Sequence, residues 1–306
     1  MFPVPRAAEG LGREGEVSRS VGISIKPGAQ RALELAVELA GWLKQQGLRV
    51  VVAGDGLDRL DGVDRLSLEE MPRHVDLMVV LGGDGALLHV ARRFIGSDTP
   101  ILGINLGRLG FLTEAPFANM LDAVATVLDG RGQVVRHSSL QATSWRDGEM
   151  LHRGMAVNDV VLQRKEHPRM IEFEMHVADQ FVFRLRADGL VLATPAGSTA
   201  YALSAGGPIV HPSLEAISVV PICPHTLSNR PVVVPDSDVI EVVLTESPAL
   251  AALNLDGQEH MALQVGDQVT VEKSGTVSLV YLPGRNYYGV LRSKLHWGGP
   301  AAEASG

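Results

Sequence analysis

The chain has 306 residues and a formal net charge of −8, and 45% of its residues are hydrophobic. This composition can bury the core of one large domain or of two ordinary ones. No cluster of basic residues is present, which argues against a nucleic-acid-binding protein, and the longest apolar runs are far too short to span a bilayer. Cys223 is the only cysteine, which excludes an intrachain disulfide and a thiolate metal cluster. We expect a cytoplasmic enzyme or binding protein with no nucleic-acid or membrane partner.

The first half of the chain predicts an α/β domain. Residues 1–20 lack the apolar core of a signal peptide and are predicted to be a disordered leader. From 21 to 131, strand-like and helix-like segments alternate, which is typical of a Rossmann-like parallel sheet with helices on its faces. Gly47 supplies a stop after the first helix. The expected strands are 21–25, 49–53, 75–81 and 100–104, and the expected helices are 29–46, 85–94 and 116–128.

Near Gly130 the pattern changes to short β-rich runs separated by turn signals. Residues 132–282 are therefore predicted to form an all-β domain, a two-layer sandwich or a similar arrangement. The helix-compatible tail, 283–306, is expected to pack back on the α/β domain. The predicted strands are 140–145, 156–163, 170–177, 181–186, 190–194, 239–244, 268–272 and 276–281, and the predicted turns are 146–149, 178–180, 256–258 and 273–275.

The first chemical motif is "GGDG" at 82–85, where an apolar run ends and helical spacing begins. In a parallel α/β sheet, ligands bind beyond the carboxyl ends of the strands, and a glycine-rich turn there lets the backbone approach a phosphate. Gly82, Gly83 and Gly85 suit this purpose. Asp84 would repel a phosphate and is better suited to a proton or a metal ion. The alternative interpretation is a tight turn with an aspartate as helix N-cap.

The second motif is "DGLVLATPAGSTAYALSAGGPIV" at 188–210, which places small residues between two apolar runs. Small residues leave room for a flat ligand or for close backbone contact. The hydroxyls of Ser198, Thr199 and Ser204 could bond to polar ligand edges, and Tyr201 could stack on a base. A structural Gly/Ser loop is the alternative.

Two further segments are candidates for the same site. The segment "GINLGRLGFLTE" at 103–114 follows another predicted strand, and its position would suit a crevice shared with the Asp84 loop, although a plain connecting loop is the alternative. In "VNDVVLQR" at 157–164, Asn158 and Asp159 interrupt an apolar strand. Adjacent strand residues point to opposite faces, so both side chains can reach one ligand only at a bulge or a strand end.

Other chemistries find little support in the sequence. A zinc-protease HExxH motif and Cys/His ligand spacing are absent. Neither the GxGxxG dinucleotide fingerprint after the first strand nor the P-loop motif is present. Ser198 follows Gly197 without a GxSxG elbow, so a serine hydrolase is a weak candidate. Closely spaced prolines at 221–235 predict a rigid extended path with an architectural role.

Taken together, these motifs resemble the NAD kinase family. The stretches "LGGDGALLHVAR", "GINLGRLGFLTE", "NDVVL", "DGLVLATPAGSTAYALSAGGPI" and "CPHTLSNRP" occur in the family's order, from about residue 21 to the C-terminal region. The resemblance implies a kinase that uses ATP, or polyphosphate, to phosphorylate the adenosine-ribose 2′-hydroxyl of NAD, giving NADP, with Mg²⁺ as the divalent cation. It also implies a homodimer or homotetramer. A lipid or other alcohol kinase sharing "GGDG", and a non-catalytic dinucleotide sensor, are the alternatives.

The resemblance also implies roles for individual residues. Asp84 becomes the general base, because a sugar hydroxyl is a poor nucleophile at neutral pH. Asp84→Asn should then keep the shape and hydrogen bonding of this side chain and remove its basicity. Gly82, Gly83 and Gly85 would contact the ATP phosphates. The implied NAD-binding residues are Asp84, Gly85, His89, Asn158, Asp159, Arg169, Arg186, Asp188, Ala196, Thr199, Ala200, Tyr201, Ser204 and Gln258.

Two positions depart from the family pattern. Ala86 follows "GGDG" where members of the superfamily often have threonine, and Ala196 stands in "TPAGSTAY" where the family has "TPTGSTAY". Neither position can therefore supply a hydroxyl.

The acidic chain also offers no obvious lysine or arginine clamp in the Asp84 loop, so we expect phosphoryl transfer to need a divalent cation. No metal ligands are indicated.

Overall fold

The computed structural model describes residues 19–26, 28–54, 60–107, 110–165, 170–247 and 251–297. All but the last two residues of the leader predicted at 1–20, and the end of the predicted tail from 298 onward, lie outside these described residues. The chain forms two compact units. Unit 1 contains the described residues up to Leu87, Thr99–Val135, and the described residues from Ser278 onward, and unit 2 contains Leu88–Asp98 and Arg136–Val277. Within the described ranges, no helix is long and apolar enough to cross a membrane.

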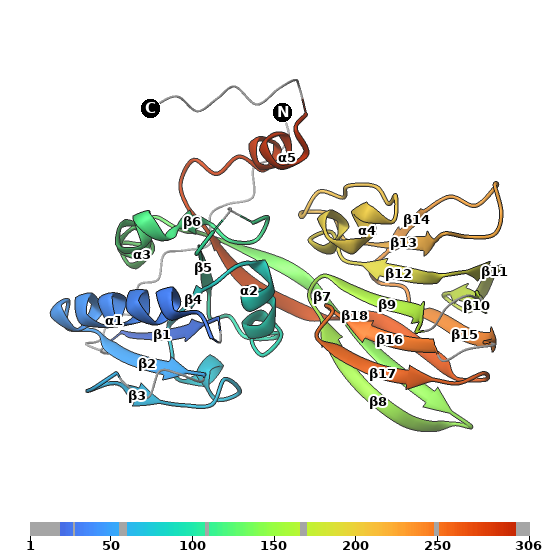
Figure 1. Ribbon diagram of the computed structural model, residues 1–306, viewed down its shortest axis with the longest axis horizontal. Coiled ribbons are helices and arrows are strands. Elements are labelled where there is room, and N and C mark those ends of the chain that lie inside the picture. The colour runs from blue at the N-terminus through green and yellow to red at the C-terminus, as the bar shows by residue number, and fades with distance from the viewer. Residues whose placement is uncertain are drawn as a thin grey trace. The chain divides into compact units, whose positions relative to one another are not determined.

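Unit 1 is built on a parallel sheet with the strand order β3-β2-β1-β4-β5 (Figure 1). Every residue of β1, β4 and β5 is buried, which explains why these strands are nearly continuous apolar runs instead of alternating patterns. The strands of this sheet are β1 (Ser20–Ile25), β2 (Arg49–Ala53), β3 (Asp64–Arg65), β4 (Leu77–Leu81), β5 (Ile101–Asn105) and β6 (Ala115–Pro116).

Helices α1 and α3 share one hydrophobic core with this sheet, burying Leu39 and Val124 in the same cluster as Val79 of β4. Helix α1 is followed by Gly47, whose φ of 75° is the left-handed conformation that favours glycine after a helix. The helical elements that begin in unit 1 are α1 (Gln30–Gln45), η1 (Met71–Arg73), α2 (Asp84–Ala91), η2 (Phe117–Asn119), α3 (Met120–Leu128) and α5 (Tyr287–Leu295).

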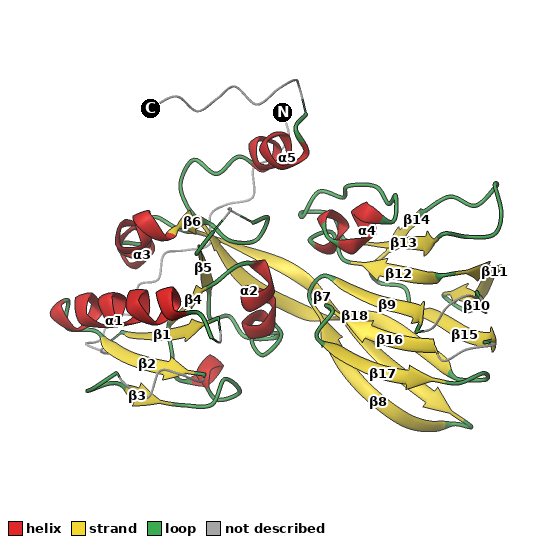
Figure 2. Cartoon of the chain, in the orientation of Figure 1, coloured by secondary structure: helices red, strands yellow, loops and turns green. Residues whose placement is uncertain are grey.

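Unit 2 is a β-sandwich (Figure 2). One sheet has the order β14-β13-β12-β9-β16-β17, and the other contains β11-β10-β15-β18 with β7 and β8. The chain passes between the units in β7 (Gln133–Arg146) and β18 (Gln268–Tyr281). The remaining strands are β8 (Glu149–Ala156), β9 (Asp159–Arg164), β10 (Ile171–Val177), β11 (Gln180–Ala187), β12 (Gly189–Ala193), β13 (Ala216–Ile222), β14 (Val232–Pro235), β15 (Ile240–Glu246), β16 (Ala251–Leu255) and β17 (Glu259–Leu263).

Alternate residues of β9 and β12 serve two different layers. Val160 and Leu162 of β9, with Leu190 and Leu192 of β12, face the core between the two sheets. Their neighbours Val161, Val191 and Ala193 face outward and pack against Ala202 of the short helix α4 (Tyr201–Ser204). The preceding 3₁₀ turn is η3 (Gly197–Thr199). The second motif of the sequence therefore covers the outer face of this sheet.

Most of the predicted elements are confirmed, with small differences at their ends. The predicted turns at 146–149, 178–180 and 256–258 are hairpin turns with left-handed residues at Asp147, Ala178 and Asp256. The predicted turn at 273–275 is wrong, because β18 continues through it as one 14-residue strand. Lys273 is held there by Asp236 at 2.7 Å, and the Gly275 carbonyl accepts a bond from Ser139.

The proline-flanked segment 221–235 is extended at both ends as predicted, and its last part forms β14, an edge strand of its sheet. Edge positions tolerate proline because no ladder donor is required on the outer side.

A second difference between prediction and structure concerns the segment Leu88–Asp98, which belongs to unit 2 although it lies within the range expected for the α/β domain. Its Arg92 side chain is buried against Asp256 and Glu259, which accounts for this grouping.

Candidate functional site

The Asp84 loop of unit 1 lies at the carboxyl end of β4, next to the carboxyl end of β5. The Gly82 N–H donates to the Ile104 carbonyl at 2.9 Å, and α2 begins at Asp84. The Asp84 carboxylate accepts three backbone bonds from the segment after β5: Oδ2 from Phe111 at 2.8 Å, and Oδ1 from Leu112 at 3.3 Å and Thr113 at 3.1 Å. The expectation that the segments 82–85 and 103–114 lie side by side is confirmed.

The glycines of these two segments have different roles. A Cβ added to Gly82 would lie 2.5 Å from the Ala86 side chain, and one added to Gly110 would lie 1.9 Å from Asp84 Oδ1. Both residues are therefore required by close packing. A Cβ on Gly83 or Gly85 would meet no atom of the described residues within 4 Å, apart from the neighbouring residues and the backbone of its own helix. These two glycines leave open space beside Asp84, which is what a ligand phosphate would need.

The expectation that asparagine preserves the hydrogen bonding of Asp84 is wrong. Both carboxylate oxygens accept backbone N–H groups, whereas an asparagine amide has only one oxygen acceptor. The amide introduced by Asp84→Asn would turn its own NH₂ toward at least one backbone N–H, and a buried donor left unsatisfied costs about 1–3 kcal/mol. Asp84 is therefore also a structural clamp between two loops.

The structure brings to this loop an arginine that no sequence motif placed there. Arg285, in the segment before α5, donates to the Phe111 carbonyl at 2.5 Å and forms an ion pair with Glu114. Its guanidinium lies over the Tyr281 ring at 3.8 Å. Burial lowers the pKa of Arg285 to about 10, and the negative charge of Asp84 opposes this shift. A cation is therefore present beside the Asp84 loop after all.

Unit 2 contains a pocket of about 290 Å³ on the outer face of the β9 sheet. Asn158 and Asn254 each present a buried polar atom, Oδ1 and Nδ2, with no hydrogen-bond partner among the described residues. Unpaired buried polar atoms are rare and call for a ligand or water. The pocket is lined by Asn158, Asp159, Val161, Gln163, Ala200, Tyr201, Asn254, Asp256, Gly257 and His260.

Asp256 explains how the adjacent residues Asn158 and Asp159 reach one pocket. Its fully buried carboxylate accepts the backbone N–H groups of Val157 and Asn158 at 2.8 Å and of Asp159 at 3.0 Å. Residue 158 thus precedes the first residue of β9, and the alternation rule does not apply to it. The expected strand end is confirmed.

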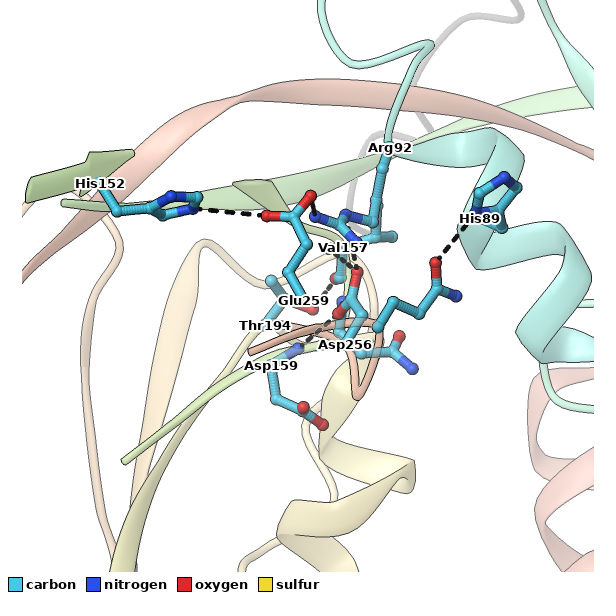
Figure 3. Close-up of polar contacts among 10 residues, drawn as sticks. His89, Arg92, His152, Val157, Asp159, Thr194, Asp256 and Glu259 are labelled. Atoms are coloured by element: carbon cyan, nitrogen blue, oxygen red, sulfur yellow. Dashed lines mark hydrogen bonds and ion pairs between the residues drawn. The ribbon is translucent and has the colours of Figure 1, made fainter. Parts of the chain in front are cut away.

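Asp256 belongs to a connected series of ionisable side chains that continues through Arg92 and Glu259 to His152 (Figure 3). Arg92 Nε lies 4.0 Å from Asp256 Oδ2, and the Arg92 guanidinium also pairs with Glu259. His152 Nε2 lies 3.5 Å from the other oxygen of Glu259. The Arg92 side chain is 4% exposed, so its charge acts on Asp256 with little screening by water.

Two buried carboxylates share this region. Burial, followed by the charge of Asp256, raises the pKa of Asp159 to about 7, and the Tyr201 N–H that bonds to Asp159 opposes the shift. Burial also raises the pKa of Asp256, against the three backbone donors and Arg92. Asp159 therefore titrates near neutral pH on the pocket wall.

The Gly/Ser/Thr segment is held by its own hydroxyls. Ser198 is fully buried, donates to the Pro195 carbonyl at 2.6 Å and accepts the Val210 N–H at 2.9 Å. Its predicted availability to a ligand, and the weak hydrolase candidate, are therefore wrong. Thr199 donates to the Ala196 carbonyl at 3.1 Å. A Cβ on Gly197 would lie 2.0 Å from the Asn158 carbonyl, so this glycine lets η3 approach β9.

The other predicted residues take varied positions. His89 Nδ1 contacts Gln258 Oε1 at 3.3 Å (Figure 3), and Asp188 is paired with Arg164 at 3.0 Å. Ala196 is buried, whereas Arg186 and Ser204 are exposed. Arg169 lies outside the described residues.

Sequence reasoning missed several residues of the pocket and its support: Arg92, Asn254, Asp256, Glu259 and His260. The only available signal was the "DGQ" turn, which contains Asp256 and was interpreted as a turn. Its left-handed φ of 51° agrees with that interpretation. Its carboxylate, however, bonds to residues about one hundred positions earlier, which no local pattern reveals.

Comparison with known proteins identifies a family for both units. The family model for the ATP-NAD kinase N-terminal domain matches residues 21–132, and the model for the C-terminal domain matches residues 157–281. The NAD kinase of Laribacter hongkongensis is 40% identical over 283 residues, covering 92% of this chain and 97% of that protein. The NAD kinase of Teredinibacter turnerae is 46% identical over 230 residues, covering 74% and 78%.

Solved structures give the same result. Yeast NADH kinase complexed with NADH superimposes with a TM-score of 0.85 at 27% identity, covering 94% of this chain and 90% of that one. An NAD kinase from Archaeoglobus fulgidus in complex with ATP gives a TM-score of 0.70 at 27% identity, covering 91% and 98%. The fold is thus an N-terminal α/β domain followed by a C-terminal β-sandwich.

The raised pKa of Asp159 predicts a pH-dependent stability difference. The folded-state pKa of about 7 exceeds the ordinary value of 3.8, so the stabilising contribution is fully present below about pH 4 and is lost as the pH rises toward 7. Asp159→Asn removes this loss. Urea unfolding at pH 4.5 and 7.5 should show the variant gaining stability relative to wild type, by up to about 1.4 kcal/mol per pH unit.

The matched control is Asp179→Asn, which removes the same charge from an exposed turn where asparagine tolerates the left-handed backbone. Any constant cost of either substitution cancels when the two pH values are compared. Equal pH trends in the two variants would contradict the assignment of the raised pKa to Asp159.

Proposed function

Because the chain belongs to the NAD kinase family, we propose that it transfers the γ-phosphoryl group of ATP to the adenosine-ribose 2′-hydroxyl of NAD, giving NADP and ADP. The main observation in favour of this reaction is the position of the Asp84 carboxylate. The Asp84 carboxylate stands in a glycine loop at the strand ends, fixed by three backbone donors. Of its two oxygens, Oδ2 accepts only one of these bonds, which leaves it a second acceptor position as far as the described residues are concerned.

Asp84 is proposed as the general base. A ribose hydroxyl that donates to Oδ2 loses its proton to this carboxylate as its oxygen bonds to the γ-phosphorus, while the bond from that phosphorus to the bridging oxygen breaks and ADP leaves with the bridging oxygen. Phosphoryl transfer passes through a loose transition state and depends mostly on positioning. A carboxylate held by three backbone bonds supplies that positioning.

Gly83 and Gly85 are proposed to let the ATP phosphates approach the backbone beside Asp84, since their missing side chains leave open space there. Among the described residues, no group of three or more His, Cys, Asp or Glu side chains is arranged to hold a metal ion. Mg²⁺ typically binds through substrate phosphates and at most one or two carboxylates. We therefore propose that the cation enters with ATP as part of this substrate.

The unit 2 pocket is proposed to bind the adenosine part of NAD. Its unpaired acceptor on Asn158 and unpaired donor on Asn254 suit a heteroaromatic base that carries both kinds of group. Asp159 suits a ribose or amino donor, and Tyr201, which is 42% exposed at the pocket, offers a stacking face. The other implied NAD contacts, and assembly as a homodimer or homotetramer, remain predictions from the resemblance.

The first test is product formation. Incubation with ATP, Mg²⁺ and NAD should yield NADP, read through a strictly NADP-dependent dehydrogenase. Excess chelator should abolish turnover, because the chain supplies no ligand cluster of its own within the described residues. Folded protein that gives no NADP above a protein-free blank would overturn the proposal, and undiminished turnover in chelator would overturn the role of the cation.

Asp84→Asn should lower kcat by roughly 10²–10⁴-fold, the usual cost of losing a general base. It should also destabilise the protein, because one loop donor loses its acceptor, so kinetics are measured well below the variant's Tm. The NAD dissociation constant from calorimetry should change far less, since the unit 2 pocket is untouched.

The control for a loosened loop is Thr113→Val. The Thr113 hydroxyl accepts the Gly110 N–H and the Asn105 amide at 2.9 Å, and its loss disturbs the loop while keeping the carboxylate. If Asp84→Asn keeps kcat within a few-fold of Thr113→Val, Asp84 is a structural clamp and not the base.

Tyr201→Ala should raise the KM for NAD, at a cost of roughly 1–3 kcal/mol if stacking resembles other base–aromatic contacts. Tyr201→Phe keeps the ring and should retain the wild-type KM. The Tyr201 backbone N–H that bonds to Asp159 survives in both variants. An unchanged KM with a collapsed kcat in Tyr201→Ala would show that the proposed binding role is wrong.

A further inference from the structure

Arg285 is the one cation that the fold brings into contact with the segment supporting Asp84, within the part of unit 1 that the structure describes. Its Nη2 donates to the Phe111 carbonyl. Phe111 and Leu112 are residues whose N–H groups hold Asp84. The arginine is 174 positions from Phe111 in sequence, and it stands in a segment outside the five stretches that carry the family resemblance.

Arg285 and Asp84 bind the two sides of a single peptide group. The carbonyl of Phe111 and the N–H of Leu112 belong to the same peptide unit, and they point in opposite directions. Arg285 donates to the carbonyl at 2.5 Å, and the N–H of that unit donates to Asp84 Oδ1 at 3.3 Å. A donor on the carbonyl side polarises the amide and strengthens its N–H as a donor, so bonds in such a chain reinforce each other.

Two of the three guanidinium nitrogens of Arg285 have partners within unit 1. Glu114 pairs with Nη1, Phe111 occupies Nη2, and the Tyr281 ring covers one face at 3.8 Å. The Arg285 side chain is 11% exposed, and that of Glu114 is 3% exposed. Glu114 is fixed in turn by the Leu282 N–H at 3.0 Å. Nη1 and Nη2 of Arg285 are thus directed at the 110–114 loop, whereas its Nε has no hydrogen-bond partner among the described residues.

We propose that Arg285 is a positioning residue for phosphoryl transfer, which fixes the Asp84 carboxylate through the Phe111–Leu112 peptide group. This inference rests on the proposed role of Asp84. A carboxylate that must accept a proton in line with the transferring phosphoryl group tolerates little displacement. Arg285 limits the displacement by tying the segment after β5 to the segment before α5 on the far side of the peptide from Asp84.

The first test compares Arg285→Gln with Arg292→Gln. Arg292 is an exposed arginine of α5, so its substitution removes the same charge from the same C-terminal segment. Arg285→Gln should lower kcat by roughly 10- to 100-fold, as small misplacements of reacting groups do. The KM for NAD should stay within about twofold, because the partners given for Arg285, which are Phe111, Glu114 and Tyr281, belong to unit 1 and are not among the residues that line the unit 2 pocket. Arg292→Gln should match wild type in both constants.

A second variant distinguishes a loss of positioning from a loss of folding. Removing Arg285 alone leaves the buried Glu114 charge without its partner, which is strongly destabilising. The pair Glu114→Gln with Arg285→Gln removes both charges and leaves neither stranded. It should fold, retain the wild-type KM for NAD, and show the same loss of kcat as the single variant.

Amide hydrogen exchange supplies a readout independent of turnover. Exchange at residues 111–113 should accelerate in the paired variant relative to wild type and to Arg292→Gln. A folded paired variant with wild-type kcat, or with unchanged exchange at these amides, would overturn the inference. If wild type itself forms no NADP, the proposed function fails, whereas the exchange result still tests whether Arg285 holds the loop.

Discussion

The site of unit 2 depends on one buried carboxylate that accepts three consecutive backbone N–H groups. Asp256 accepts the N–H groups of Val157, Asn158 and Asp159, and this interaction holds the backbone at the beginning of β9, where two adjacent polar side chains line one pocket. A fully buried charge is costly unless it is paired and hydrogen-bonded. Three backbone donors and the buried cation of Arg92 meet that condition. The pocket wall is thus a consequence of satisfying one buried charge.

In unit 1 a carboxylate is also held by backbone N–H groups, but this carboxylate is less buried than that of Asp256. Asp84 also accepts three consecutive backbone N–H groups, but it is only partly buried, and among the described residues its Oδ2 has a single hydrogen-bond donor. Gly110 permits the close approach, because any side chain there would occupy the position of the carboxylate. On the proposed function, Asp84 has to be both immobile and accessible to a ligand hydroxyl. Backbone donors on one side and glycine-bordered space on the other provide the two properties together.

The charge of the molecule explains why these local devices are needed. An acidic chain with a net charge of −8 cannot attract an anionic nucleotide through its overall field. Backbone N–H groups and single buried arginines have to supply positive potential at the place where each carboxylate stands, and Arg92 and Arg285 do so in unit 2 and unit 1. Both guanidinium groups pair with carboxylates of the protein, and that of Arg285 also donates to a backbone carbonyl. On the proposed function, neutralisation of the phosphates is therefore left to a cation that arrives with them.

The sequence by itself determined the alternation of strands and helices, the change to β structure near residue 130, and most hairpin turns. These features depend on hydrophobic period and on left-handed residues such as Asp147, which act over a few positions. The motifs also located Asp84, Asn158 and Asp159. Only the tertiary structure decided that Asp256 holds the 157–159 backbone and that Arg285 reaches the Asp84 loop. These contacts join residues about 100 and 170 positions apart, and they depend on which groups the fold buries together, which no local pattern encodes.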